Sequence, residues 1–418
     1  MISMRCRMKR NTIAVVFFAL IFILAGCAHG IKNTNISSEA DIQLTQEEKL
    51  EDFEYMYMIL EENYPYFEVN KKQNDINWLS KKAEYIAIIK SADDDKQFFY
   101  ALDDVLDELN NCHTNMLDKN FYSYCKSIYE KVPEYRAPWL NILTDPKAVK
   151  RYESMTSTEN DHPFSANAVV PDNVKTCILE GNKTAYMSVS SFNSFNIKSD
   201  VKIIGDFFRS VKDYEKLIID IRGNGGGDSG YWSKYMVPML INEPVNDTRY
   251  FVYRGGSYSE RFIECIKGCG YKKLKKISDI DKENLPNLPP NLKQNFKYYS
   301  KSVKYYKPKY SVGFKGEIYL LIDEDVYSSA DAFAVFAKDT GFATLVGKTT
   351  QGDGIGFDPI LCLLPNSGYI FRFPDQMGLT ADGTCNCEYK TVPDIEVEAD
   401  RSEKIFDDEA VKAVLNLK

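Results

Sequence analysis

Residues 317–354 constrain the fold of this chain more than any other stretch. They contain an apolar strand pattern at 317–322, an apolar helix pattern that begins at Ser328, a second short strand pattern at 343–346 and a glycine-rich loop. A buried strand that leads directly into a helix is typical of an α/β fold. A serine on the first turn of such a helix lies near unpaired backbone N–H groups and the positive end of the helix dipole, which favour a developing oxyanion.

Ser328 has two interpretations. With Asp331 it forms a Ser-x-x-Asp capping box, in which the serine hydroxyl only caps the helix and the acid reaches back. Alternatively, the hydroxyl is a nucleophile placed at the end of the helix where negative charge is stabilised. The two interpretations predict the same local pattern, so the choice between them depends on other segments.

The N-terminus predicts export. A basic region (Arg5, Arg7, Lys9, Arg10) precedes a short apolar run at 12–24, and Leu24-Ala25-Gly26-Cys27 follows. A run this short predicts a signal peptide at 1–26 and not a membrane span. The last four residues resemble the bacterial lipobox, in which Cys27 is lipidated; a chance cysteine after an ordinary cleavage site is the alternative. We therefore expect an extracytoplasmic protein that is lipid-anchored to a bacterial membrane through Cys27.

The mature chain is acidic. Removal of residues 1–26 leaves 392 residues and takes away four positive charges, which moves the formal net charge from −8 to −12. Such a charge argues against nucleic-acid binding. The length suggests two or three domains, and the 44% hydrophobic content suits a globular body with a sizeable core.

Eight cysteines lie beyond Cys27: Cys112, Cys125, Cys177, Cys265, Cys269, Cys362, Cys385 and Cys387. Outside the cytoplasm some of them can form disulfides, although the sequence does not give the connectivity. Cys265 and Cys269 are a candidate pair, and buried free thiols are the alternative. The spacings lack the paired CxxC or histidine partners of a zinc site, so we expect no metal and no other cofactor.

Helix patterns dominate the first part of the mature chain. After a polar tether at 27–44, the capping box Thr45-x-x-Glu48 opens the first of three expected helices. We expect a three-helix N-terminal domain over 45–115, which delivers His113 just past its last helix. A connector over 116–173 follows; it is too short and too poor in strand patterns for a separate PDZ domain.

An α/β pattern continues from residue 174 to 418. A Lys/Tyr-rich insertion at 243–313 interrupts it, for which a solvated cap over a cleft is a better explanation than stacking on nucleic acid. The apolar strand pattern at 217–221 runs into Arg222-Gly223-Asn224-Gly225-Gly226-Gly227. This loop lacks both GxxxxGK[ST] and GxGxxG, so a nucleotide site is weakly supported. Such a loop can instead present backbone N–H groups to an oxyanion.

Four motifs occur in a recognisable order: IIDIRGNGGG at 218–227, SSAD at 328–331, LVGKTTQGDG at 345–354 and PDI at 393–395. Together they resemble the tail-specific protease family, or C-terminal processing peptidases, which includes the tricorn core and the repeats of interphotoreceptor retinoid-binding protein. NYPYF at 63–67 and LDELNNCHTNM at 106–116 resemble the non-processing branch of that family. The resemblance implies a crotonase-like (ClpP-like) core of repeated β-β-α units.

The resemblance also implies roles for single residues. Ser328 matches the nucleophile, and the backbone N–H of Ser329 would complete an oxyanion hole with Gly225 or Gly226, of which Gly226 is the better match. The processing branch has a lysine base in the glycine-rich loop after the serine. This chain has Asp353 at that position, and Lys348 comes too early to match.

A histidine base from the helical domain, as in the tricorn-like branch, is therefore implied. His113 lies in the matching motif, whereas His29 lies in the tether and His162 in the connector. Glu388, just before the PDI motif, matches the supporting acid. With no base in the glycine-rich loop, Asp353→Asn is expected to leave the nucleophile largely reactive.

Two cysteines flank these expected residues. Cys112 stands beside His113, where tricorn-like enzymes have a serine that links the histidine to the acid, and Cys387 stands beside Glu388. If the site assembles as expected, the two cysteines could form a disulfide, or one could tune the site by redox chemistry.

The sequence thus predicts a membrane-anchored serine peptidase that acts on a peptide or protein substrate. A non-catalytic ligand- or peptide-binding lipoprotein on the same scaffold is the alternative, because fold alone does not determine function. An esterase with the same site is a third interpretation. A Ser–His–Glu set beside a glycine-rich loop favours catalysis, since a binding module does not need it.

Overall fold

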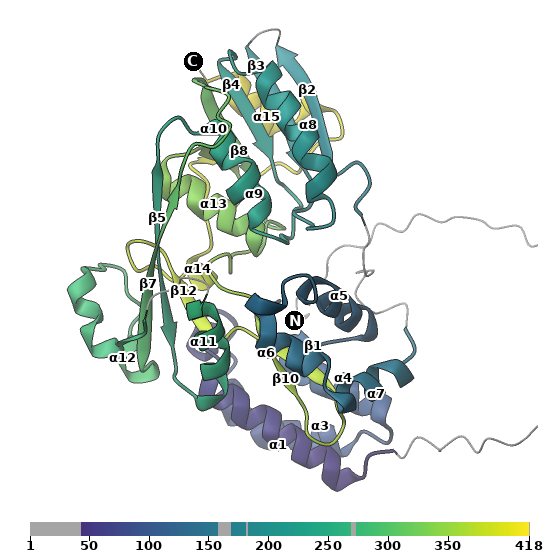
Figure 1. Cartoon of the computed structure of the whole chain (residues 1–418). Helices are drawn as coiled ribbons and strands as arrows, with labels where there is room; N and C mark the ends of the chain where they lie inside the picture. Colours follow the sequence, from purple (N-terminus) through teal and green to yellow (C-terminus); the bar gives the residue numbers. More distant parts are fainter. Residues whose placement is uncertain (1–42, 158–168, 181–182, 269–272, 418) are drawn as a thin grey trace, which may run out of the picture.

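The structure is a computed structural model and describes residues 43–157, 169–180, 183–268 and 273–417 (Figure 1). The expected signal peptide and the lipidation site Cys27 lie outside the described residues, as do His29, His162 and Cys269. Within the described ranges, no helix is both long and apolar enough to cross a membrane.

A six-stranded sheet, in the order β13-β9-β8-β4-β3-β2, forms the centre of the α/β core. Its strands are β2 (Val174–Glu180), β3 (Thr184–Val189), β4 (Lys216–Asp220), β8 (Glu317–Ile322), β9 (Thr344–Gly347) and β13 (Ile395–Glu396). All neighbours pair in parallel except β2 and β3. The strands β4 and β8 are apolar runs because both faces of a parallel sheet are covered. The mixed α/β fold expected from the sequence is confirmed.

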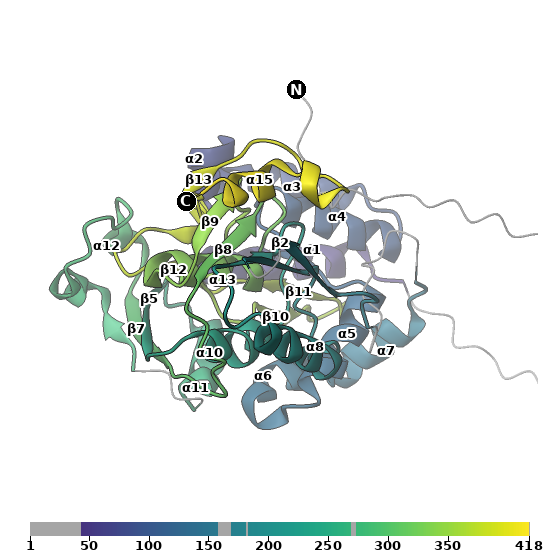
Figure 2. The same ribbon diagram turned by 90° about the horizontal axis from the view of Figure 1, so that it is seen from above.

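Helices cover both faces of this sheet. One face shares a hydrophobic cluster with α8 (Ile197–Ser210), α9 (Gly230–Tyr235), α10 (Val237–Leu240) and α13 (Ser329–Thr340), and α15 (Glu409–Leu415) packs on the other face. Figure 2 shows α8 and α15 on opposite sides of β8. Phe333 and Phe336 anchor α13 in the first cluster, so the residues at its N-terminus are held on a rigid element.

Helices dominate the N-terminal part. They are α1 (Gln46–Asn63), α2 (Phe67–Asn74), the 3₁₀-helix η1 (Trp78–Lys81), α3 (Lys82–Lys90), α4 (Asp95–Asp107), α5 (Lys119–Tyr129), α6 (Pro133–Leu143) and α7 (Pro146–Ser154). The predicted capping box of Thr45 and Glu48 is formed. Helix α2 was not among the three helices expected up to residue 115. It is only eight residues long and largely polar, so it lacks the apolar stripe by which a helix is predicted from sequence.

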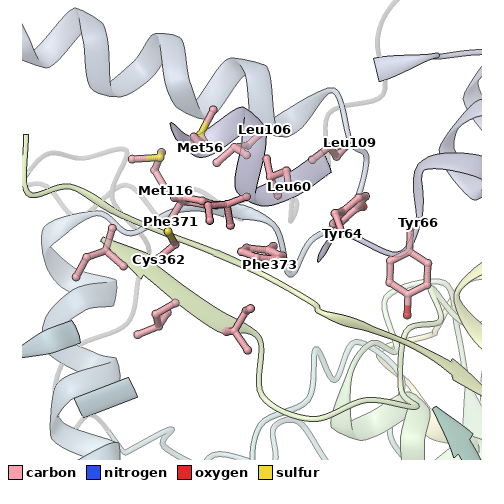
Figure 3. Close-up of a cluster of buried hydrophobic side chains, with 14 of the residues drawn as sticks. Met56, Leu60, Tyr64, Tyr66, Leu106, Leu109, Met116, Cys362, Phe371 and Phe373 are labelled. Carbon is pink, nitrogen blue, oxygen red and sulfur yellow. The ribbon is translucent and has the colours of Figure 1, made fainter. Parts of the chain in front are cut away.

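Strands from the C-terminal part complete the core of the helical part. β1 (Asn115–Met116), β11 (Ile370–Phe373) and β10 (Ile360–Leu363) form a three-stranded sheet in the order β1-β11-β10. Figure 3 shows Phe371 and Phe373 among side chains of the helical part such as Leu60 and Leu106. The chain therefore crosses from the six-stranded sheet to the helical part between β9 and β10.

The segment expected as an insertion forms most of a third sheet, in the order β12-β5-β7-β6. Its elements are β5 (Val245–Tyr253), η2 (Ser257–Ser259), α11 (Glu260–Gly268), β6 (Lys275–Lys276), η3 (Ile277–Glu283), α12 (Leu292–Asn295) and β7 (Tyr298–Tyr306), while β12 (Gln376–Leu379) comes from further along the chain. The Lys/Tyr-rich stretch is largely β7, which pairs with β5 along nine residues. The remaining elements are α14 (Asn386–Tyr389) and η4 (Ile405–Asp407).

Candidate active site

Ser328 lies in the tight turn between β8 and α13, with the unusual backbone angles φ +54° and ψ −124°. A positive φ is strained for a residue other than glycine, and such residues cluster at functional sites. The hydroxyl makes no capping hydrogen bond to the helix within the described structure; instead, its Oγ lies 3.0 Å from His113 Nε2. The capping-box interpretation of Ser328 is therefore wrong.

Asp331, the other half of the expected capping box, has a different task. Its fully buried carboxylate accepts hydrogen bonds from Thr350 Oγ1 and Thr391 Oγ1, both at 2.6 Å, and from Gly354 N at 3.0 Å. Burial raises the pKa of Asp331, and these hydrogen bonds oppose the rise. The carboxylate thus ties the first turn of α13 to the loop at 350–354.

His113 lies in the loop between α4 and β1. Its backbone N–H donates to Asn111 Oδ1 at 3.0 Å, and β1, which begins two residues later, pairs with β11. Its ring centroid is 4.7 Å from that of Tyr327, the residue before Ser328. The side chain is 16% exposed, so part of it remains accessible to solvent. The pairing of β1 with β11 brings this loop of the helical part to the nucleophile.

Asp353 supplies the third group of the site. Its Oδ2 lies 2.8 Å from His113 Nδ1 and also accepts hydrogen bonds from Asn111 Nδ2 at 2.9 Å and Tyr327 Oη at 3.0 Å. Tyr66 Oη donates to the other oxygen at 3.2 Å. Burial alone would raise the pKa of Asp353, but the charge of His113 and the donated hydrogen bonds hold the pKa below its ordinary value.

The loop at 350–354 holds Asp353 in place. It belongs to the chain that crosses from β9 to β10, and it runs beside the turn before α13, where Gln351 N donates to Val326 O at 2.9 Å. Asp353 itself has φ +59°, and Gly354 N also donates to Asn386 Oδ1 at 2.7 Å. Asp353 therefore lies where the two parts of the molecule meet.

Glu388, the expected supporting acid, does not contact His113 in the described structure. Its carboxylate pairs with Lys72 of α2 instead. Its backbone carbonyl accepts a hydrogen bond from Gln73 Nε2 at 2.7 Å. The unexpected helix α2 thus contacts α14 and pairs with Glu388. The structure assigns the position opposite His113 Nδ1 to Asp353, which the sequence showed only as an acid standing where a lysine was expected.

The expected Cys112–Cys387 disulfide is not formed. Cys387 is a free thiol whose Sγ lies 3.9 Å from Asn111 Nδ2, and burial raises its pKa well above the ordinary value. Cys112 Sγ accepts a hydrogen bond from Gln351 Nε2 at 3.2 Å. The pairing expectation rested on Glu388 lying at His113, and it fails for the same reason.

The glycine-rich loop lies against the nucleophile. A Cβ atom built on Gly226, which has φ +102°, would lie 2.9 Å from Ser329 N and 3.0 Å from Ser328 Cβ. The N–H of Gly226 donates to Asn224 Oδ1 at 2.9 Å. The N–H groups of Gly225 and Ser329 have no acceptor among the described residues, and a Cβ on Gly225 would meet nothing within 4 Å. The free N–H of Ser329 therefore lies beside Ser328, whereas Gly226 would have to share its N–H with an oxyanion.

The described residues around Ser328 offer no set of metal ligands. Within the described ranges, no group of three or more histidine, cysteine, aspartate or glutamate side chains is placed to hold a metal ion. What the geometry does offer is a hydroxyl, an imidazole and a carboxylate in one hydrogen-bonded line, with backbone donors beside the hydroxyl. This is the arrangement of nucleophilic acyl transfer.

The sequence comparison agrees with this chemistry. The model of peptidase family S41 matches residues 183–397, just over half of the chain. The chain belongs to peptidase family S41. The resemblance to the tail-specific protease family is thereby confirmed.

Solved structures share the fold of this S41 chain at low sequence identity. A candidate peptidase from Parabacteroides merdae is 19% identical with a TM-score of 0.55, and the match covers 88% of this chain and 95% of that one. Mature CPAF is 13% identical with a TM-score of 0.52 over 84% of this chain and 92% of its own. At these identities the likeness concerns the fold alone. No curated protein sequence matches the chain.

Proposed function

We propose that this S41 chain is a serine peptidase that uses Ser328 as nucleophile, His113 as general base and Asp353 as the group that orients the histidine. The observation that carries the proposal is the continuous line from Ser328 Oγ through His113, with contacts of 3.0 and 2.8 Å to the serine and the aspartate. Both distances lie within hydrogen-bond reach, as a nucleophile and its base require.

The proposed reaction begins when Ser328 Oγ attacks the carbonyl carbon of a peptide bond and passes its proton to His113 Nε2. The Ser329 N–H and the Gly225–Gly226 loop hold the oxyanion, and His113 returns the proton to the leaving amine, which leaves an acyl-enzyme. Water, activated by the same histidine, then hydrolyses the ester. Asp353 keeps a proton on Nδ1, so Nε2 is free to accept one, and it stabilises the imidazolium.

The surrounding fold supports the crotonase-like assignment. β2, β3 and α8 form one β-β-α unit, and the parallel strands β4 and β8 each lead into a helix beside the glycine-rich loop and Ser328. We extend the proposal to this core type, with the helical part of the chain supplying the base. A module that only binds a ligand has no need of the Ser328–His113–Asp353 line, and no contact in the described residues favours that alternative.

Reaction with a fluorophosphonate tests the proposal. The wild-type chain is expected to be labelled, while Ser328→Ala and His113→Ala are not. Ser210→Ala, which removes an exposed serine of α8, is the matched control and is expected to label like the wild type. Labelling that persists in Ser328→Ala would assign the nucleophile elsewhere.

The lipid anchor on Cys27 and the extracytoplasmic location complete the proposal, on the strength of the lipobox-like sequence alone. Cells grown with radiolabelled palmitate are expected to label the wild-type chain and not Cys27→Ser. Label that remains in Cys27→Ser would remove the anchor from the account.

A further inference from the structure

Arg372 is a partly buried cation beside the site that has no ion pair within the described structure. Its neighbours in β11, Phe371 and Phe373, point into the apolar core (Figure 3), so the alternation of a strand turns Arg372 to the opposite face. There its Nε donates to Asn115 Oδ1 at 2.7 Å and its Nη2 to Cys112 O at 3.0 Å.

The guanidinium lies within reach of the proposed reaction. Cys112 directly precedes His113, and the charge of Arg372 acts on Tyr327, the residue before Ser328. Burial and the carboxylate of Asp353 raise the pKa of Tyr327 well above its ordinary value, and Arg372 opposes that rise. The hydrogen bond to Cys112 O thus places Arg372 directly beside the histidine loop.

Helix α5 also packs against the guanidinium of Arg372. The guanidinium carbon lies 4.4 Å from the ring centroid of Phe121. Burial raises the pKa of Tyr124 to about 12; Asp228, which follows the glycine-rich loop, adds to the rise and Arg372 opposes it. The ring contact with Phe121 thus places the cation against α5.

The buried charge of Arg372 has no ion pair to offset the cost of its removal from water. Burying a charge is costly unless an opposite charge or several hydrogen bonds replace water, and burial lowers the pKa of Arg372. Its two acceptors are neutral oxygens, and Nη1 has no acceptor among the described residues. The carboxylate of Asp358 acts on the guanidinium without an ion pair to it, and forms its own ion pair with Arg136 at 2.9 Å. The planar fork of arginine binds a carboxylate through two parallel hydrogen bonds, so a carboxylate is the ligand that this site lacks.

We propose that Arg372 binds a carboxylate of the peptide substrate next to the bond that is cut, which selects peptides with a carboxylate at that place. The carboxylate is either an acidic side chain or the C-terminus of the peptide, since both present the same two oxygens. This inference rests on the proposed peptidase function and adds the substrate class to it.

The proposed carboxylate binding is tested with three pools of acetylated octapeptides. The measurement is the concentration at which each pool protects the wild-type chain from fluorophosphonate labelling. One pool has no acidic side chain and a free C-terminal acid, the second is the same pool as C-terminal amides, and the third is an amide pool with one glutamate at varied positions. At least one carboxylate pool is expected to protect at concentrations about ten- to a hundredfold lower than the neutral amide pool. The pool that gains this advantage identifies the source of the carboxylate.

Arg372→Gln is expected to remove the advantage. Arg151→Gln is the matched control, because Arg151 also stacks on an aromatic ring, Tyr369 at 4.8 Å, but has its own ion pair with Asp95 at 2.9 Å. Arg151→Gln should keep the advantage of the wild type.

Two outcomes overturn the inference: a wild type that does not distinguish the three pools, or an Arg372→Gln variant that still does. A variant that labels slowly without peptide but keeps the advantage would reduce Arg372 to a positioning residue for the histidine loop. If the wild type is not labelled at all, the proposed function fails instead. Direct calorimetric titration of the same pools into wild type and Arg372→Gln then still decides whether Arg372 binds a carboxylate.

Discussion

Replacement of Asp353 by asparagine tests the reassigned third group, and the hydrogen bonds around the carboxylate give the size of the effect. Oδ2 accepts from three donors, His113, Asn111 and Tyr327, whereas Oδ1 accepts only from Tyr66 Oη. An asparagine amide therefore keeps its oxygen at the Oδ2 position and turns its NH₂ toward Tyr66. The tyrosine hydroxyl can rotate to accept that hydrogen bond, because hydroxyls both donate and accept.

In this orientation His113 keeps its Nδ1 proton, so only the negative charge is lost. A hydrogen bond to a charged group contributes about 1.5–3 kcal/mol, against about 0.5–1.5 kcal/mol for a neutral one. The difference of about 1–2.5 kcal/mol predicts that Asp353→Asn slows fluorophosphonate labelling by about fivefold to seventyfold. This reverses the expectation drawn from the sequence, in which the same change left the nucleophile largely reactive.

The assay is the second-order rate constant of labelling at constant pH, with Asp375→Asn as control because Asp375 is another buried aspartate, outside the triad. A loss below about twofold would refute the role of Asp353. A loss near 10⁴-fold, the value for a triad whose histidine is forced into the wrong tautomer, would refute the argument about the amide orientation. Thermal unfolding of each variant checks that the fold is intact.

Three further predictions address the loop, the core and the pH dependence. Gly226→Ala places a methyl group 2.8 Å from Tyr327 O at a positive φ and should slow labelling by about 10²- to 10³-fold, whereas Gly225→Ala meets open space and should have a much smaller effect, as measured by the same rate constant. Arg222→Met removes the cation that the buried carboxylates of Asp220 and Asp408 share and should lower the free energy of unfolding in urea by about 3–5 kcal/mol, although Arg401 stays 3.6 Å from Asp220. Arg209→Met, in an exposed pair, should change it by less than about 1 kcal/mol. Burial raises the pKa of Asp375 to about 7, so the folded chain holds a proton that the unfolded chain releases above about pH 4, and stability falls as pH rises between these values. Asp375→Asn should flatten the Tm of the chain between pH 5 and 8, and a Tm slope equal to that of the wild type would contradict the assignment.

Local patterns predicted the parts of the site that are continuous in sequence. The strand, turn and helix around Ser328 follow from apolar runs and a break between them, and the glycine-rich loop follows from its composition. His113 was identified by its motif and by the scarcity of histidines. The first two depend on short-range preferences, whereas the choice of His113 as the base came from the resemblance to the tricorn-like branch.

The third member of the triad depends on long-range contacts that no local pattern contains. Asp353 and His113 are 240 positions apart, and they meet because β1 pairs with β11 and because the chain crosses between two sheets just before β10. Glu388 pairs instead with Lys72 on α2, a helix too short and polar to be expected. Asp353 was noted in the sequence, but the sequence did not show that its carboxylate points toward His113.

Hydrolysis of a denatured protein tests the central claim most directly. Denatured casein is incubated with the purified chain, and newly formed amino groups are counted by reaction with an amine-specific dye and located by mass spectrometry. The account predicts new amino termini with the wild type and none with Ser328→Ala or His113→Ala. New termini that persist in Ser328→Ala, or their absence from a wild type that is fully labelled by fluorophosphonate, would contradict it.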